Sequence, residues 1–308
     1  MVVSAARPQP VSRERQSDTL FDISVYGLNL QVSCNEPAFI HWLRYLLPGA
    51  LFQPIAAPYA DEGRATVEYQ VHMGYTDPED PEPNTVTRNG ELIHRASARC
   101  HLQAFMERSI TRELTRHVPP HHLVHAGAAV KDGHGILLPA RSRSGKSTLL
   151  AALALSGFDY YSDEIAILTP EGRLLPFPKA ATLRGPGWQA LNARFPETKA
   201  FVYTPECEGK LRHLAAPSST PTTLDRLACP VDIIAFPCYD PDQASSLQPL
   251  PTAMALGRLA RQSLNLSLLG KPGMDALFNL VQNAQCYDFF TNDLAQAVSL
   301  LEEKLAQL

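Results

Sequence analysis

Alternating apolar and polar residues predict strands in the first third of the chain. From Leu20 to Cys34 the apolar side chains recur at nearly every second position, and Gly27 interrupts the pattern near its middle. A period of two is typical of a strand with one buried face, so we expect a hairpin that turns near Gly27. Residues 65–74 alternate in the same way, and strands over 85–88 and 91–94 are expected to flank a turn at Asn89-Gly90.

Two helical segments are predicted in the same part of the chain. The first runs from residue 36 to 47 and stops at Pro48, and the second runs from 98 to 117 and stops at Pro119-Pro120. Proline has no N–H group and clashes with the preceding helical turn, so it ends a helix. We place a domain boundary at the proline pair. The predicted organisation is a flexible tail over 1–18, a small α+β domain of unknown role over 19–118, and a second domain over 119–308.

The second domain is assigned to the α/β class. Gly157 is expected to end its first helix as a C-cap, and residues 207–223, rich in Pro, Ser and Thr, are expected to form a loop. The last helix begins at Leu294 and presents an apolar face of Leu294, Val298, Leu301 and Leu305. Strands are expected over 123–131, 135–139, 159–168, 173–177, 231–236 and 287–290, and the other helices over 147–155, 251–264 and 274–282.

Composition narrows the function classes. Hydrophobic residues make up 45% of the chain and charged residues 19%, as in ordinary globular enzymes. The net charge of −4 leaves no basic excess, so the sequence argues against nucleic acid as the main partner. Six scattered cysteines without a CxxC pair favour reduced thiols over disulfides or zinc. The N-terminal residues lack the apolar core of a signal peptide, and no run approaches ~18 apolar residues, so we expect no membrane span and a cytoplasmic protein.

One short segment carries recognisable chemistry. Residues 140–148 read Ala-Arg-Ser-Arg-Ser-Gly-Lys-Ser-Thr, which fits the P-loop pattern and lies between an expected strand and an expected helix. The N–H groups of such a loop form an anion-binding nest, and the helix dipole adds to it. Lys146 would reach the β- and γ-phosphates, and the Ser147 hydroxyl would bind Mg²⁺. The alternative is a basic loop that caps a helix. The predicted nucleotide-binding residues are Arg141, Ser142, Arg143, Ser144, Gly145, Lys146, Ser147 and Thr148.

The P-loop alone does not identify the reaction. Transport ATPases of the ABC type share the string Gly-Lys-Ser-Thr-Leu-Leu, but they also carry an LSGGQ-like signature, and this sequence has none. The nearest acidic pair, Asp163-Glu164, lies only 17 residues after Lys146, whereas the acidic strand of those ATPases is distant. We therefore reject that class.

Residues 123–188 resemble the catalytic core of HPr kinase/phosphorylase, whose fold is akin to that of PEP carboxykinase. His125 stands 15 residues before Ala140, at the distance of the active-site histidine of that family. Asp163-Glu164 fall on its acidic pair. Gly133, Gly135, Gly157 and the segment Leu183-Arg184-Gly185-Pro186-Gly187 match further glycine and arginine positions. The chain departs from the family at Ala126, Glu164 and Thr182.

The resemblance implies ATP and Mg²⁺ as cofactors and a role for each matched residue. Asp163 would be the general base for an acceptor hydroxyl, with a purely metal-binding carboxylate as the alternative. Glu164 would either contact the metal or point away. His125 would hold Asp163 or the phosphoryl group, and Arg184 would neutralise charge there; the alternatives are a structural histidine and a surface arginine. The expected catalytic residues are Asp163, His125, Lys146 and Arg184, and the expected metal ligands are Ser147, Asp163 and Glu164.

The segment Pro176-Phe177-Pro178 and the region from 235 to 294 are similar to the HPr-kinase-related proteins of peptide-modification clusters, the kinase A group. In those clusters the kinase-like protein accompanies a small peptide chaperone. The resemblance implies Mg-ATP-dependent phosphorylation of a Ser or Thr hydroxyl on a small protein or peptide. A small-molecule alcohol is the alternative acceptor, and a nucleotide-responsive binding module without catalysis is the alternative class. A peptide chaperone and a second copy of the chain are further partners to consider. Lys210, Arg212 and His213 either meet a ligand or form a solvated face.

Overall fold

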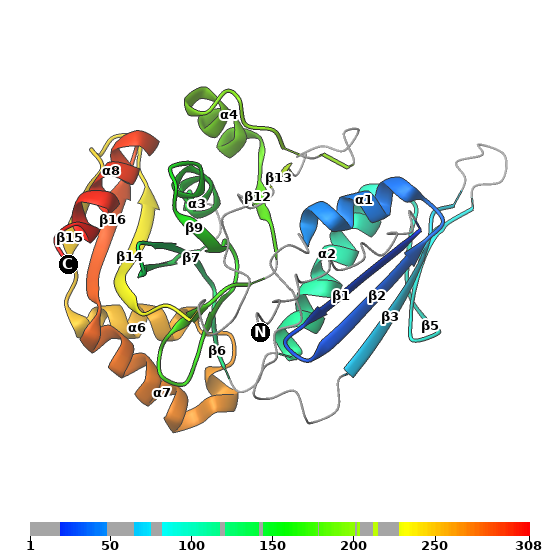
Figure 1. Cartoon of the computed structure of the whole chain (residues 1–308), viewed down its shortest axis with the longest axis horizontal. Coiled ribbons are helices and arrows are strands. Elements are labelled where there is room, and N and C mark those ends of the chain that lie inside the picture. Colours follow the sequence, from blue (N-terminus) through cyan, green and yellow to red (C-terminus); the bar gives the residue numbers. More distant parts are fainter. Residues whose placement is uncertain are drawn as a thin grey trace, which may run out of the picture.

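The chain folds into a mixed α/β structure with several sheets, the larger two of five and six strands (Figure 1). The computed structural model describes residues 19–47, 65–74, 82–117, 121–141, 144–177, 179–200, 202–203, 212–214 and 228–308. The predicted tail over 1–18 and the proline pair at 119–120 lie outside these ranges. All strands of the five-stranded sheet precede that proline pair, and all strands of the six-stranded sheet follow it.

The five-stranded sheet begins with the predicted hairpin. Strands β1 (Leu20–Val25) and β2 (Leu28–Cys34) pair antiparallel, and Gly27 adopts a φ of 82° in the turn between them. Asn89-Gly90 forms the second predicted turn, between β4 and β5. Both hairpin predictions are confirmed. The remaining strands are β3 (Ala65–His72), β4 (Asn84–Arg88) and β5 (Glu91–Ala96), in the order β1-β2-β3-β4-β5.

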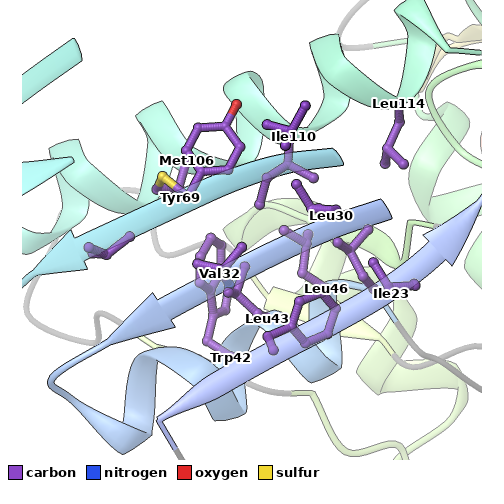
Figure 2. Close-up of a cluster of buried hydrophobic side chains, with 14 of the residues drawn as sticks. Ile23, Leu30, Val32, Trp42, Leu43, Leu46, Tyr69, Met106, Ile110 and Leu114 are labelled. Carbon is purple, nitrogen blue, oxygen red and sulfur yellow. The ribbon is translucent and has the colours of Figure 1, made fainter. Parts of the chain in front are cut away.

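Two helices cover one face of this sheet (Figure 1). They are α1 (Pro37–Leu46) and α2 (Arg99–Arg116), close to the predicted bounds. Along β1, β2 and β3 every second side chain is buried, so one face of these strands is apolar. Trp42 of α1 and Met106 of α2 pack with Val32 and Tyr69 of the strands in a core that Figure 2 shows.

The six-stranded sheet carries the P-loop. Its order is β15-β16-β14-β8-β7-β9, and the three central neighbours β16, β14 and β8 run parallel. Helices α3, α4 and α8 lie on one face, and α6 and α7 lie on the other (Figure 1). The strands are β7 (Ala126–Lys131), β8 (His134–Pro139), β9 (Asp159–Ser162), β14 (Val231–Tyr239), β15 (Ser246–Pro249) and β16 (Gln285–Thr291). The helices are α3 (Lys146–Leu155), α4 (Gly185–Arg194), α6 (Thr252–Gln262), α7 (Leu266–Asn283) and α8 (Leu294–Leu305).

Two strands that the sequence predicts as continuous are each broken. The expected strand over 123–131 divides at His125 into β6 (His122–Val124) and β7, and the one over 159–168 divides after Ser162 into β9 and β10 (Ala166–Leu168). β6 and β10 pair with each other in a small separate sheet that also holds β11 (Leu174–Leu175), whereas β7 and β9 pair in the six-stranded sheet. The segments 122–131 and 159–168 therefore both pass from one sheet to the other, and their breaks lie opposite each other.

Other differences lie towards the C-terminus. The helix expected over 274–282 begins earlier, at Leu266. α7 consists of two helical pieces that are joined at Gly270, a non-helical residue with a φ of 59° and a ψ of −135°. The expected loop over 207–223 contains β13 (Arg212–Leu214), which pairs with β12 (Ala181–Leu183), and its other residues lie outside the described ranges. α4, β12 and β15 had no sequence prediction. The buried side chains of α8 include three of its four predicted apolar positions, Val298, Leu301 and Leu305.

Candidate active site

The P-loop connects the end of β8 with the first residue of α3. Gly145 precedes the helix with a φ of 85° and a ψ of −2°, in the left-handed region that glycine adopts without strain. Its carbonyl oxygen accepts the N–H of Leu149 at 3.0 Å, which closes the first helical turn. Within the described chain, no side chain caps this helix, so its first N–H groups remain available to an anion. Ser142 and Arg143 of the predicted site lie outside the described residues.

Two close approaches fix the position of α3. A Cβ atom on Gly127 of β7 would lie 2.0 Å from Cδ1 of Leu150, and one on Gly187 of α4 would lie 2.4 Å from Oγ1 of Thr148. At either distance a side chain would require Leu150 or Thr148 to shift. Glycine at these two positions therefore allows the P-loop helix to sit directly against the sheet and against the first turn of α4.

Lys146 is a buried cation that has no hydrogen-bond partner among the described residues. Its side chain is only 6% exposed, and its Nζ atom makes no hydrogen bond to any described residue. Burial lowers the pKa of Lys146 to about 8, and the nearby charge of Lys179 acts in the same direction, against Asp163 and Glu164. The hydroxyl of Ser144 is likewise buried without a partner in the described structure. An unpaired ammonium in the interior is costly, so this position fits an anionic ligand such as a phosphate.

Asp163 lies immediately after β9, at the second strand break. Its carboxylate Oδ2 accepts the main-chain N–H of Thr182 at 3.0 Å, so β12 holds it in place. The side chain is buried, and burial raises the pKa of Asp163 above its ordinary value; Lys179, the Thr182 N–H and Lys146 oppose this shift. A carboxylate with a raised pKa beside two cations is suited to accept a proton or bind a metal ion.

Lys179 joins this site to the N-terminal part of the chain. Its ammonium lies 2.8 Å from Oε1 of Glu107 on α2 and also pairs with the carboxylate of Glu164. Burial alone would lower the pKa of Lys179, but Glu107, Glu164 and Asp163 raise it above its ordinary value. The main-chain N–H of Ala180 donates to the carbonyl oxygen of Leu46 at 2.8 Å, so the segment is anchored on α1 as well.

His125 lies at the first strand break and bonds to α6. Its main-chain N–H donates to the main-chain carbonyl oxygen of Gln262 at 2.7 Å, and its ring nitrogen Nδ1 lies 3.3 Å from the side-chain oxygen of Gln262. Burial lowers the pKa of His125, and the charge of Lys146 lowers it further, while Gln262 and Glu164 act in the opposite direction. No hydrogen bond joins the ring to Asp163 in the part of the chain that the structure describes.

Arg184 stands at the edge of this group. It is exposed and precedes the first residue of α4, three positions before Gly187, which contacts Thr148. Its carbonyl oxygen accepts the N–H of Trp188 at 2.8 Å. Of the basic cluster, Arg212 and His213 pair through their backbone with Leu183 and Thr182, while the side chains of both residues and all of Lys210 lie outside what the structure describes.

The structure thus gathers Lys146, Asp163 and Glu164, with His125 beside them. Sequence reasoning missed Lys179, Glu107 and Gln262. Each of them reaches the site from a distant segment, and none stands in a motif, so no local signal could have identified them. Among the described residues, no group of three or more His, Cys, Asp or Glu side chains is arranged to hold a metal ion.

Comparisons with known proteins add no family to this picture. No protein-family model matches the chain, and no curated protein matches its sequence. The resemblance to HPr kinases therefore stays a prediction from individual residues. None of the helices in the described ranges is long and apolar enough to cross a membrane.

Proposed function

We propose that this chain is an Mg-ATP-dependent phosphotransferase of the HPr-kinase-like, PEP-carboxykinase-like fold, which phosphorylates a Ser or Thr hydroxyl on a small protein or peptide. The observation that carries the proposal is Lys146, a buried ammonium without a partner among the described residues, at the start of an uncapped helix. Such an arrangement is stabilised by a bound phosphate, because the ligand supplies the missing counter-charge.

The neighbouring residues support phosphoryl transfer rather than binding alone. Ser147 follows Lys146 at the metal-binding position of a P-loop, and the Asp163 carboxylate is close enough to Lys146 to raise its pKa, so Ser147 and Asp163 are the residues that would hold Mg²⁺. Mg-ATP, when bound, supplies the phosphoryl group and the charge that polarises it. The raised pKa of Asp163 brings this carboxylate closer to neutral pH, which favours its use as a general base for the acceptor hydroxyl.

The remaining polar residues would position this base. Lys179 holds Glu164 by an ion pair and lowers the cost of a charged Asp163 nearby. His125, kept neutral at pH 7 by its lowered pKa, would orient groups at the site through Nε2, the ring nitrogen that does not face Gln262. Arg184 at the start of α4 would approach the acceptor.

One observation favours the binding-module alternative. His125 bonds to Gln262 rather than to Asp163, so one of the two contacts that the resemblance implies for His125, the one with Asp163, is not formed among the described residues. A nucleotide-responsive module without catalysis would retain the P-loop and Lys146 and lose only this contact. A small-molecule kinase would keep all of the site and differ in its acceptor.

Calorimetric titration with Mg-ATP tests the proposal directly. Lys146→Ala should abolish phosphoryl transfer and weaken ATP binding, whereas Lys271→Ala, a matched change at a lysine that is 83% exposed, should leave both unchanged. Unchanged ATP affinity in Lys146→Ala would reject the P-loop site. Radiolabelled ATP then separates the alternatives: label on protein supports the proposal, label on a metabolite supports a small-molecule kinase, and tight binding without transfer supports the module.

A further inference from the structure

A cavity of about 310 Å³ opens beside the first residues of the P-loop. It lies where β8 and β14 end and the last turn of α6 passes them. Phe236 of β14 belongs to the apolar core under α6 and α7, so the cavity is on the sheet face opposite the P-loop helix α3. The side chains that matter for its chemistry are Arg141, Phe236, Arg258, Arg261 and Gln262.

The charge of this cavity is strongly positive. Three of its lining residues are arginines, and none is an acid. Arg258 is neutralised by an ion pair with Asp288 and lies over the ring of Phe236, 5.5 Å from its centre. Arg141 and Arg261 are exposed and make no ion pair with any residue that the structure describes. Two arginines that line the cavity therefore have no ion-pair partner in the described chain, and the ring of Phe236 lies in the same lining.

The cavity is connected to the proposed catalytic residues. Gln262, which lines it, is the residue that bonds to His125 through both its main chain and its side chain. Arg141 begins the loop that ends at Lys146. A molecule bound in the cavity would therefore lie beside the P-loop, on the side of His125. Because phosphoryl transfer requires the acceptor to be held close to the phosphates, a site next to the P-loop is suited to bind part of an acceptor.

We propose that this cavity binds a carboxylate of the acceptor peptide, so that the enzyme selects a Ser or Thr with an acidic residue close to it. This inference rests on the proposed function. Guanidinium groups recognise carboxylates through paired, charged hydrogen bonds, and Phe236 supplies the apolar surface for the side-chain stem. Arg141 and Arg261 hold the carboxylate, and Arg258 keeps the aromatic wall in place.

The test uses serine-centred peptides with acidic, neutral or basic flanking residues. Fluorescence anisotropy without nucleotide should show acidic peptides binding about tenfold more tightly than neutral ones, the contribution expected from one charged hydrogen bond. Arg261→Gln should remove this preference and leave ATP affinity unchanged. Arg112→Gln, which removes an exposed arginine on α2, should preserve the preference and serves as the matched control.

The outcomes separate this inference from the proposed function. Arg261-dependent binding of acidic peptides without phosphate transfer keeps the cavity's role and rejects the kinase. Transfer to peptides without acidic preference keeps the kinase and overturns the inference. A loss of ATP affinity in Arg261→Gln overturns it too, because the cavity would then belong to the nucleotide site. If phosphoserine or succinate binds in an Arg261-dependent way and no peptide does, the bound carboxylate does not come from a peptide. That result overturns the inference and supports a small-molecule acceptor.

Discussion

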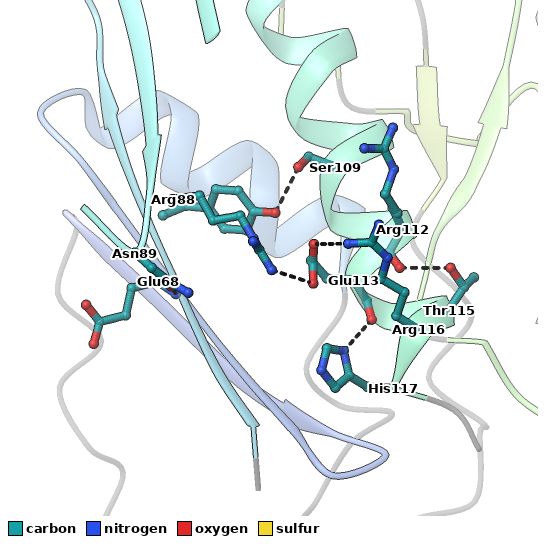
Figure 3. A network of polar contacts seen from close by, with 10 residues as sticks. Glu68, Arg88, Asn89, Ser109, Arg112, Glu113, Thr115, Arg116 and His117 are labelled. Atoms are coloured by element: carbon teal, nitrogen blue, oxygen red, sulfur yellow. Dashed lines mark hydrogen bonds and ion pairs between the residues drawn. The ribbon is translucent and has the colours of Figure 1, made fainter. Parts of the chain in front are cut away.

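In the part of the chain that the structure describes, the buried carboxylate of Glu113 in the five-stranded region has ion-pair partners, whereas the buried ammonium of Lys146 in the P-loop region has none. On α2, the carboxylate of Glu113 is 4% exposed and accepts hydrogen bonds from Arg88 at 3.1 Å and Arg116 at 3.4 Å, as Figure 3 shows. Nearby, the hydroxyls of Tyr69 and Ser109 lie 2.8 Å apart. At the P-loop, Lys146 is buried to a similar depth and has no partner in the described chain.

This difference distinguishes a structural ion pair from a ligand-binding site. A buried charge with partners of its own stabilises the folded chain and has little affinity left for a ligand. A buried charge without partners destabilises the free protein and gains energy when a ligand of opposite charge arrives. The two buried lysines of the site show the same contrast, since Lys179 pairs with two glutamates and Lys146 pairs with none of the described residues.

Among changes that leave ATP binding nearly intact, the largest expected effect is at Asp163. Asn is nearly isosteric with Asp but cannot accept a proton at neutral pH, so Asp163→Asn should lower kcat by about 10²–10⁴ and keep ATP affinity within a few-fold. Single-turnover transfer at saturating nucleotide measures this. If Asp163 only binds metal, ATP affinity should fall as well and extra Mg²⁺ should restore part of the rate. Near-normal transfer would exclude both roles.

Glu107→Gln tests whether the ion pair between Glu107 and Lys179 stabilises the folded chain. Glu107 and Lys179 are 12% and 6% exposed, so the change leaves a buried ammonium with one glutamate fewer. We expect a loss of about 3 kcal/mol in the free energy of unfolding, measured by urea denaturation. Phosphoryl transfer should also fall, because Lys179 supports Glu164 and Asp163. Full stability in the variant would show that the link between α2 and the site carries no energy.

Glu113→Gln is the matched change away from the site. Its two arginines are 34% and 59% exposed and regain water when the charge is lost, so the expected destabilisation is smaller, about 1–2 kcal/mol. ATP affinity, measured by calorimetry, should be unchanged. Weaker ATP binding would contradict the distinction between the two regions, because the network around Glu113 would then contribute to the ligand site.

Lys146→Met should raise the stability of the ligand-free protein, whereas the two glutamate substitutions should lower it. The substitution removes a buried, unpaired charge and keeps an unbranched stem, so the ligand-free protein should become more stable by about 1 kcal/mol, while ATP binding is lost. Thermal denaturation with and without Mg-ATP measures both effects, with Lys271→Met as the exposed control. A less stable ligand-free variant would mean that Lys146 has a structural role.

Ser147→Ala is expected to have the smallest effect. It removes the proposed metal-binding hydroxyl and leaves the loop backbone intact, so the Mg²⁺ concentration for half-maximal rate should rise several-fold. Rate measurements across a Mg²⁺ series provide the readout. Identical Mg²⁺ dependence in the variant and the unchanged protein would remove Ser147 from the metal site.

The sequence by itself determined the local elements. The hairpin at Gly27, the turn at Asn89-Gly90, both N-terminal helices, the P-loop helix with its glycine at 157, and α8 all lie within a few residues of their predicted bounds. Their signals are short-range, because side-chain period, proline stops and left-handed glycines act over one or two turns of chain. The P-loop motif is local for the same reason.

Only the tertiary structure decided how these elements form a site. The breaks at His125 and after Ser162 follow from pairing with different sheets, which an apolar run of sequence cannot express. Lys179 meets Glu107, and Gln262 meets His125, across long stretches of chain. That Lys146 has no partner among the described residues is also a property of the assembled interior, because burial and pairing depend on which segments pack around a residue.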